Sequence, residues 1–124
     1  MSDEAWSPSD LPAVSYIRVA SSEVDDAARA AERQRAQIAL AAEHMGLRMA
    51  EEFADVGYSG VSMDRPGLRR LLDHVTAQRV GYCVVATSDR LSEDPEDAAD
   101  IDEALSDALV AIVVAADHIG PTAP

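Results

Sequence analysis

Hydrophobic and polar positions follow two different periods along the chain. Three short apolar runs with β-branched residues predict strands at Ala13–Val19, Val80–Ala86 and Leu109–Ala116. A shorter segment with charges among its apolar residues, Leu47–Phe53, predicts a fourth strand. Segments with helical spacing separate them, from Asp26 to Met45, from Pro66 to Ala77, and from Pro95 onward. The second helix shows the clearest pattern, because one apolar face collects Leu68, Leu71, Leu72 and Val75.

Residues with special backbone preferences mark the ends of these elements. Gly46 is predicted to be the left-handed C-cap of the first helix. Asp94 is predicted to cap the third helix, with Pro95 at its first position and Glu96 and Asp97 in its first turn. Helix capping accounts for this acidic cluster without a metal ion. The glycines and serine of segment 55–60 predict a loop, and the charges within 47–53 favour an edge strand.

The element order βαβαβαβ predicts the fold class. Strands that alternate with helices favour a three-layer α/β fold, with about four mainly parallel strands and helices on both faces. Residues 13–118 are predicted to form this domain, and 1–12 and 119–124 to be flexible tails. In such folds ligands bind at the carboxyl ends of the strands.

Composition narrows the class of protein further. No apolar run approaches the roughly 18 residues that cross a bilayer, and no signal-peptide pattern opens the chain, so we expect a cytoplasmic protein. The single cysteine, Cys83, lies in an apolar run and is predicted to be a buried, inert thiol. Trp6 stands alone in the leading tail, where it could cover an apolar patch or engage a partner.

The net charge of −13 bears on nucleic-acid binding. Lysine and arginine supply most of the affinity for DNA, and this chain contains no lysine. DNA is therefore expected to bind only weakly or through a partner. The three histidines lack metal-ligand spacing and no glycine-rich phosphate loop follows the first strand, so we expect no metal or cofactor.

Several short motifs follow one another in a recognisable order. They are Tyr16-Ile17-Arg18-Val19-Ala20, Gln34-Arg35 sixteen residues after Arg18, Gly57-Tyr58-Ser59-Gly60, Asp64-Arg65-Pro66-Gly67-Leu68 and Asp89-Arg90-Leu91-Ser92. Each motif alone is weak, but together they resemble the catalytic domain of serine recombinases, the family of resolvases, invertases and large integrases. The resemblance runs from Ala13 to Pro124.

This resemblance implies a chemistry and a set of site residues. The family attacks a DNA phosphodiester with a serine hydroxyl, without metal, so arginines must stabilise the charge on the phosphate. Arg18, Arg65 and Arg90 would do so, with Arg18 and Arg90 at the ends of neighbouring strands. Asp89 would orient the arginines or handle a proton, and Gln34 would support the loop that carries the nucleophile.

Two positions depart from the family pattern. Ala20 occupies the position of the nucleophilic serine, and Glu93 replaces a second arginine after Asp89-Arg90-Leu91-Ser92. The chain also ends about where the family's long subunit-pairing helix begins. We therefore expect an inactive recombinase-like domain, acting as a regulatory partner of its own copies or of another recombinase-like chain, or surviving as a vestige.

Two alternatives remain at this stage. Ser21 could replace the missing nucleophile if the register slides by one residue, and another chain would then supply DNA binding. The sixteen-residue spacing from Arg18 to Gln34 opposes that slide. An unrelated α/β signalling domain would carry an acidic phosphoacceptor at a strand end, where this chain has Ala20.

Overall fold

The computed structural model describes residues 11–20, 25–58 and 64–119. The predicted tails lie mostly outside these ranges, as do Trp6, Ser21 and the end of the predicted 55–60 loop. The elements are, in order, β1 (Pro12–Val19), α1 (Ala27–Met45), β2 (Arg48–Val56), α2 (Pro66–Ala77), β3 (Tyr82–Val85), the short 3-10 helix η4 (Ser88–Arg90), α3 (Pro95–Asp107), β4 (Ala111–Val114) and α4 (Ala116–Ile119).

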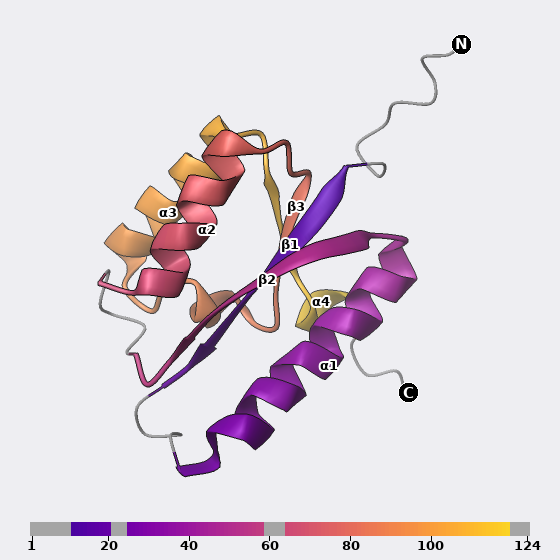
Figure 1. The fold of residues 1–124 in the computed structure, drawn as a ribbon, viewed down its shortest axis with the longest axis vertical. Coiled ribbons are helices and arrows are strands. Elements are labelled where there is room, and N and C mark those ends of the chain that lie inside the picture. The colour runs from indigo at the N-terminus through magenta and orange to yellow at the C-terminus, as the bar shows by residue number, and fades with distance from the viewer. Residues whose placement is uncertain (1–10, 21–24, 59–63, 120–124) are drawn as a thin grey trace.

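The four strands form one parallel sheet in the order β2-β1-β3-β4. Helices α2 and α3 cover one face, and α1 and α4 cover the other (Figure 1). This arrangement confirms the predicted three-layer α/β fold and the edge position of the second strand. The chain first moves from β1 to β2 and then crosses to β3 on the other side of β1, so strand order reverses between β1 and β3.

Strand β1 lies at the centre of the core. Its residues alternate between faces, as strand geometry requires. Val14 and Tyr16 pack towards α2 and α3, whereas Ala13 and Ile17 pack towards α1. Cys83 on β3 is fully buried, and burial raises the pKa of its thiol to about 12, which agrees with the predicted inert thiol.

The predicted caps are confirmed. Gly46 has φ 70° and ψ 32°, the left-handed conformation that ends α1. Asp94 caps α3 by accepting a hydrogen bond from the backbone N–H of Glu96 at 3.1 Å.

Several predicted boundaries are wrong. Strand β2 continues to Val56, which pairs with Val19, so Asp55 belongs to a strand and not to a loop. Strand β4 ends at Val114, and Ala116 begins α4. Segment 109–116 is apolar throughout, and the apolar pattern alone did not separate the four paired residues from the turns beside them.

None of the described helices is long and apolar enough to cross a membrane.

Leu109 adopts a conformation that favours glycine. Its φ is 63° and its side chain is 78% exposed, so packing does not offset the backbone cost. Hydrogen bonds from Leu109 N to Ser106 O and from Val110 N to Leu105 O, 2.9 and 2.8 Å, form the Schellman motif that ends α3. We expect Leu109→Gly to raise the free energy of unfolding by about 1 kcal/mol in urea titration.

The matched control is Leu40→Gly, at a half-exposed position inside α1. There glycine should lower the free energy of unfolding by about 1 kcal/mol. If both replacements destabilise the protein equally, the positive φ of Leu109 carries no cost.

Candidate active site

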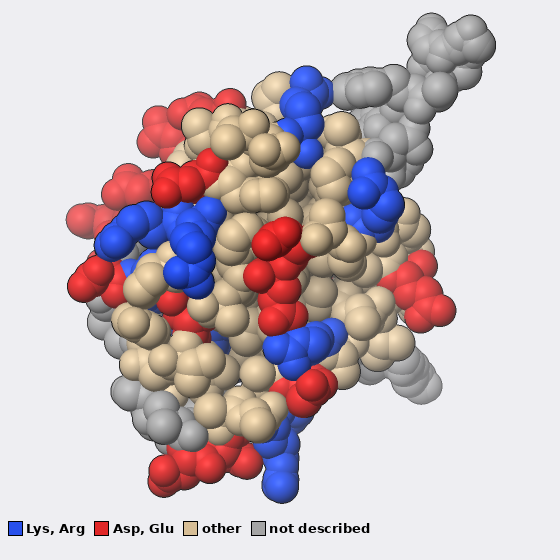
Figure 2. All heavy atoms as spheres, viewed as in Figure 1, with Lys and Arg blue, Asp and Glu red and all other residues tan. Residues whose placement is uncertain are grey.

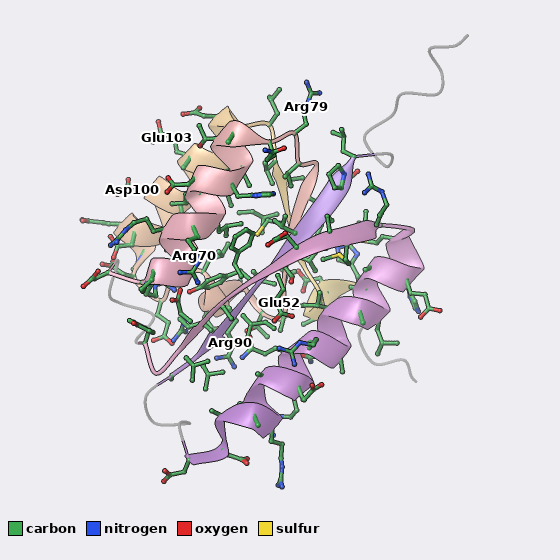
Figure 3. The ribbon with its side chains drawn as sticks, in the orientation of Figure 1. Glu52, Arg70, Arg79, Arg90, Asp100 and Glu103 are labelled. Carbon is green, nitrogen blue, oxygen red and sulfur yellow. The ribbon has the colours of Figure 1, made fainter. Side chains whose placement is uncertain are left out.

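Four of the residues singled out from the sequence lie together at the carboxyl ends of β1 and β3, where strand order reverses: Arg18, Gln34, Arg65 and Arg90. Arg18 lies near the end of β1, and Arg90 follows β3 in η4. The Nη1 atom of Arg90 donates to the backbone oxygen of Arg18 at 3.0 Å. Strands β1 and β3 pair directly, which confirms the predicted neighbourhood. Figure 3 shows Arg90 at this end of the sheet, on the side of α1.

Arg18 is almost completely buried, with 1% of its surface exposed. Its guanidinium donates to three backbone oxygens, those of Tyr58 at 3.2 Å, Asp89 at 3.0 Å and Arg90 at 3.2 Å. A fourth hydrogen bond joins Nη2 to the carboxylate of Glu93 at 2.9 Å. Arg18 therefore links the end of β1 to the segments that follow β2 and β3.

Gln34 fixes the backbone at the end of β1. Its Nε2 donates to the oxygen of Arg18 at 2.9 Å, and its Oε1 accepts from the nitrogen of Arg18 at 3.3 Å. The side chain is buried against β1 at the middle of α1. Gln34 thus supports the segment that leads to Ala20, two residues beyond Arg18.

Arg65 is the second buried guanidinium of the site. Nη1 donates to the hydroxyl of Tyr16 at 3.3 Å and to the oxygen of Arg90 at 3.2 Å, and Nη2 donates to the oxygen of Leu91. Its Cζ also lies 5.7 Å from the centre of the Tyr16 ring, within the range of a cation–π contact. Arg65 thereby joins the start of α2 to η4 and the turn after it.

Asp55 was not singled out from the sequence, because its segment was predicted to be a loop. It is 3% exposed and accepts three hydrogen bonds, from Tyr16 Oη at 2.6 Å, Gly67 N at 2.7 Å and Leu68 N at 2.9 Å. Its carboxylate therefore caps the N-terminus of α2. The signal that could have found it is the two-residue period of the strand, which places Asp55 on the same face as buried Phe53.

Tyr16 connects the two charged groups of this network. Its hydroxyl donates to Asp55 and accepts from Arg65. Burial, and then the hydrogen bond to Asp55, raise the pKa of the Tyr16 phenol well above its usual value. The phenol therefore stays protonated and acts as a donor to the carboxylate over the physiological pH range.

The carboxylate of Asp89 does not contact Arg18 or Arg90. It accepts a hydrogen bond from the Thr87 hydroxyl at 2.5 Å and is exposed, while only the backbone oxygen of Asp89 reaches Arg18. Ser21, the alternative nucleophile, lies outside the described residues.

A pocket of about 330 Å³ opens beside this site, along α1. Arg33 and Arg90 line it, together with Ala30, Gln34, Ala36 and Gln37. Three arginines thus concentrate positive charge at one end of the sheet, the kind of charge that binds phosphate. Arg18 and Arg65 are buried and bonded to backbone oxygens, so of the three arginines Arg18, Arg65 and Arg90 it is Arg90 that lines this opening, together with Arg33 of α1. Among the described residues no cluster of His, Cys, Asp or Glu could hold a metal ion.

Comparison with known proteins identifies the fold. Residues 13–124 match the family model described as the N-terminal domain of resolvase. The catalytic domain of ISC1926 TnpA, an IS607-like serine recombinase, is 29% identical with a TM-score of 0.72, over 85% of this chain and 70% of the other. The catalytic domain of IS1535 TnpA, also an IS607-like serine recombinase, is 32% identical with a TM-score of 0.64. The match covers 82% of this chain and 69% of the other.

A resolvase-family site-specific recombinase from Streptococcus pneumoniae shares the fold, with a TM-score of 0.75 at 20% identity, over 88% of this chain and 74% of the other. No curated protein sequence is similar enough to count as a match. The family model covers nearly the whole described fold, including both buried arginines. The chain therefore belongs to the resolvase N-terminal domain family of serine recombinases.

Proposed function

We propose that this chain is a serine-recombinase-like domain that does not cleave DNA and acts as a regulatory partner of its own copies or of another recombinase-like chain. Ala20 carries the proposal. It directly follows β1, two residues after Arg18, where the family pattern has the serine nucleophile. A methyl group has no lone pair with which to attack phosphorus, so the residue at this position cannot form a phosphoserine bond.

The arginines support the same proposal. Arg18 and Arg65 direct their donors to backbone oxygens of segments 58 and 89–91, and Arg18 also pairs with Glu93. A guanidinium acts on a phosphate only through N–H groups that point at it. In this chain these groups hold loops together at the end of the sheet.

The surface charge opposes an independent role on DNA. Net charge is −13 and the chain has no lysine. On the face shown in Figure 2, acidic groups lie between the arginines, and no continuous basic surface forms. Because affinity for DNA depends on neutralising several phosphates together, we propose that DNA contact is weak or supplied by a partner in the cytoplasm.

The test joins this domain to the long helix and DNA-binding domain of an active serine recombinase and supplies that enzyme's DNA site. We expect the unchanged domain to give no protein–DNA adduct that survives denaturation. Ala20→Ser combined with Glu93→Arg should give adducts, because it restores a nucleophile and replaces an anion beside Arg18 with a cation. Each single replacement serves as a matched control.

The competing function is an active domain that uses Ser21. An adduct formed by the unchanged domain and lost in Ser21→Ala would establish that function and refute the proposed one.

A further inference from the structure

The buried guanidinium of Arg18 has one charged partner among the described residues, Glu93. Backbone oxygens satisfy three of its hydrogen bonds but carry no net charge. A buried cation is costly unless an anion balances it. The carboxylate of Glu93, 2.9 Å from Nη2, supplies that anion.

Glu93 reaches Arg18 from a well-held turn. It lies between η4 and α3, directly before the helix cap Asp94. Ser92 Oγ donates to the backbone oxygen of Asp94 at 3.2 Å and accepts from its nitrogen at 3.1 Å. While Arg18 is 1% exposed, the Glu93 side chain is 47% exposed. The carboxylate of Glu93 therefore contacts the buried guanidinium from a side chain that is itself about half exposed to solvent.

We propose that Glu93 is a resident anion, which occupies the position on Arg18 that a phosphate group would take and so excludes phosphates from this site. Carboxylate and phosphate oxygens both accept hydrogen bonds from a guanidinium. Nη2 has two N–H groups, one bonded to the Asp89 oxygen and the other to Glu93, so a phosphate could take the second one only if the carboxylate left it. A second anion beside Glu93 would also meet its negative charge. Glu93 thus determines whether Arg18 can bind a phosphate group.

This inference deepens the proposed function and rests on it in one respect, since it treats Arg18 as idle in catalysis. The proposed lack of DNA cleavage and the proposed exclusion of phosphate by Glu93 can be refuted separately. The adduct assay detects a nucleophile, whereas reversible binding of phosphate detects an open anion site and needs no nucleophile.

The experiment titrates the full chain with inorganic phosphate at low ionic strength. Glu93→Ala removes the carboxylate and opens space, and Glu93→Gln removes the charge while keeping the side-chain length. The control is Glu96→Gln, an exposed acid in the first turn of α3 that leaves the Arg18 contacts intact. Binding is measured by calorimetry, and the Nε–H resonance of Arg18 reports whether phosphate reaches this guanidinium.

We expect Glu93→Ala to bind phosphate at least about tenfold more tightly than the unchanged chain, with a shift of the Arg18 resonance. Glu93→Gln should show a smaller gain, and Glu96→Gln should match the unchanged chain. The proposal is overturned if Glu93→Ala, shown to be folded by circular dichroism, binds phosphate no more tightly than the unchanged chain, whether both bind it at Arg18 or neither does. It is equally overturned if folded Glu93→Gln shows no gain in phosphate binding over the unchanged chain.

Discussion

Gly67→Ala is expected to lower the free energy of unfolding by about 3 kcal/mol or more. A Cβ atom at Gly67 would lie 2.3 Å from the backbone oxygen of Ala54 and 2.8 Å from Oδ2 of Asp55. Neither atom can move easily, because one belongs to the backbone of strand β2 and the other belongs to a carboxylate that accepts three hydrogen bonds. Alanine would therefore force α2 away from the sheet and weaken the cap at its N-terminus.

The control for this prediction is Gly46→Ala, measured in the same urea titration. Gly46 has a positive φ of 70°, but no atom lies within 4 Å of its Cβ position. Its replacement tests the backbone cost alone, which is about 1 kcal/mol. If Gly67→Ala costs no more than Gly46→Ala, then α2 does not depend on its close approach to β2.

Local patterns were sufficient to predict most of the fold. The apolar face of the second helix, the glycine after Met45 and the Asp94-Pro95 pair each specify a structure within a few residues, and all three are confirmed. The order of strands and helices then restricts the sheet to a parallel arrangement. Strand ends were less predictable, because β2 ends where pairing with β1 ends, and that depends on a distant part of the chain.

The sequence predicted four of the residues that lie together at this end of the sheet, but it missed Asp55 and did not predict the contacts. Arg18, Gln34, Arg65 and Arg90 come together as expected, although their catalytic roles stay predictions. The sequence does not reveal that backbone oxygens take up most donors of Arg18 and Arg65. Nor does the sequence reveal that the carboxylate of Glu93 pairs with Arg18. Such pairings depend on side-chain directions across loops separated by up to 75 residues.

These contacts give Arg18 and Arg65 a structural role that does not depend on a nucleophile. Arg18 and Arg65 are the largest fully buried side chains among the described residues. Together they hold the segments after β1, β2 and β3 at one end of the sheet. Removing either would leave buried backbone oxygens without donors, a cost of about 1–3 kcal/mol for each such group. Stability alone therefore favours keeping both arginines, whether or not the domain acts on DNA.

Asp55→Asn is expected to lower the free energy of unfolding by about 3 kcal/mol, because the carboxylate accepts three hydrogen bonds in a buried site. The amide offers one oxygen, and its NH₂ group would face at least one of the donors from Tyr16, Gly67 and Leu68. The negative charge that favours the N-terminus of α2 would also be lost.

Asp73→Asn is the matched control, since Asp73 lies exposed on the same helix, and its replacement should change stability by less than about 0.5 kcal/mol.

Hydrogen exchange separates a lost cap from general destabilisation. Relative to the unchanged chain, Asp55→Asn should increase the exchange rates of the Gly67 and Leu68 amides more than those of amides at the centre of α2. An equal increase along the whole of α2 would contradict a capping role. Because Asp55 and Arg65 both bind the Tyr16 hydroxyl, loss of this cap should also release Arg65 and, through Arg90 and Leu91, loosen the end of the sheet where Arg18 lies.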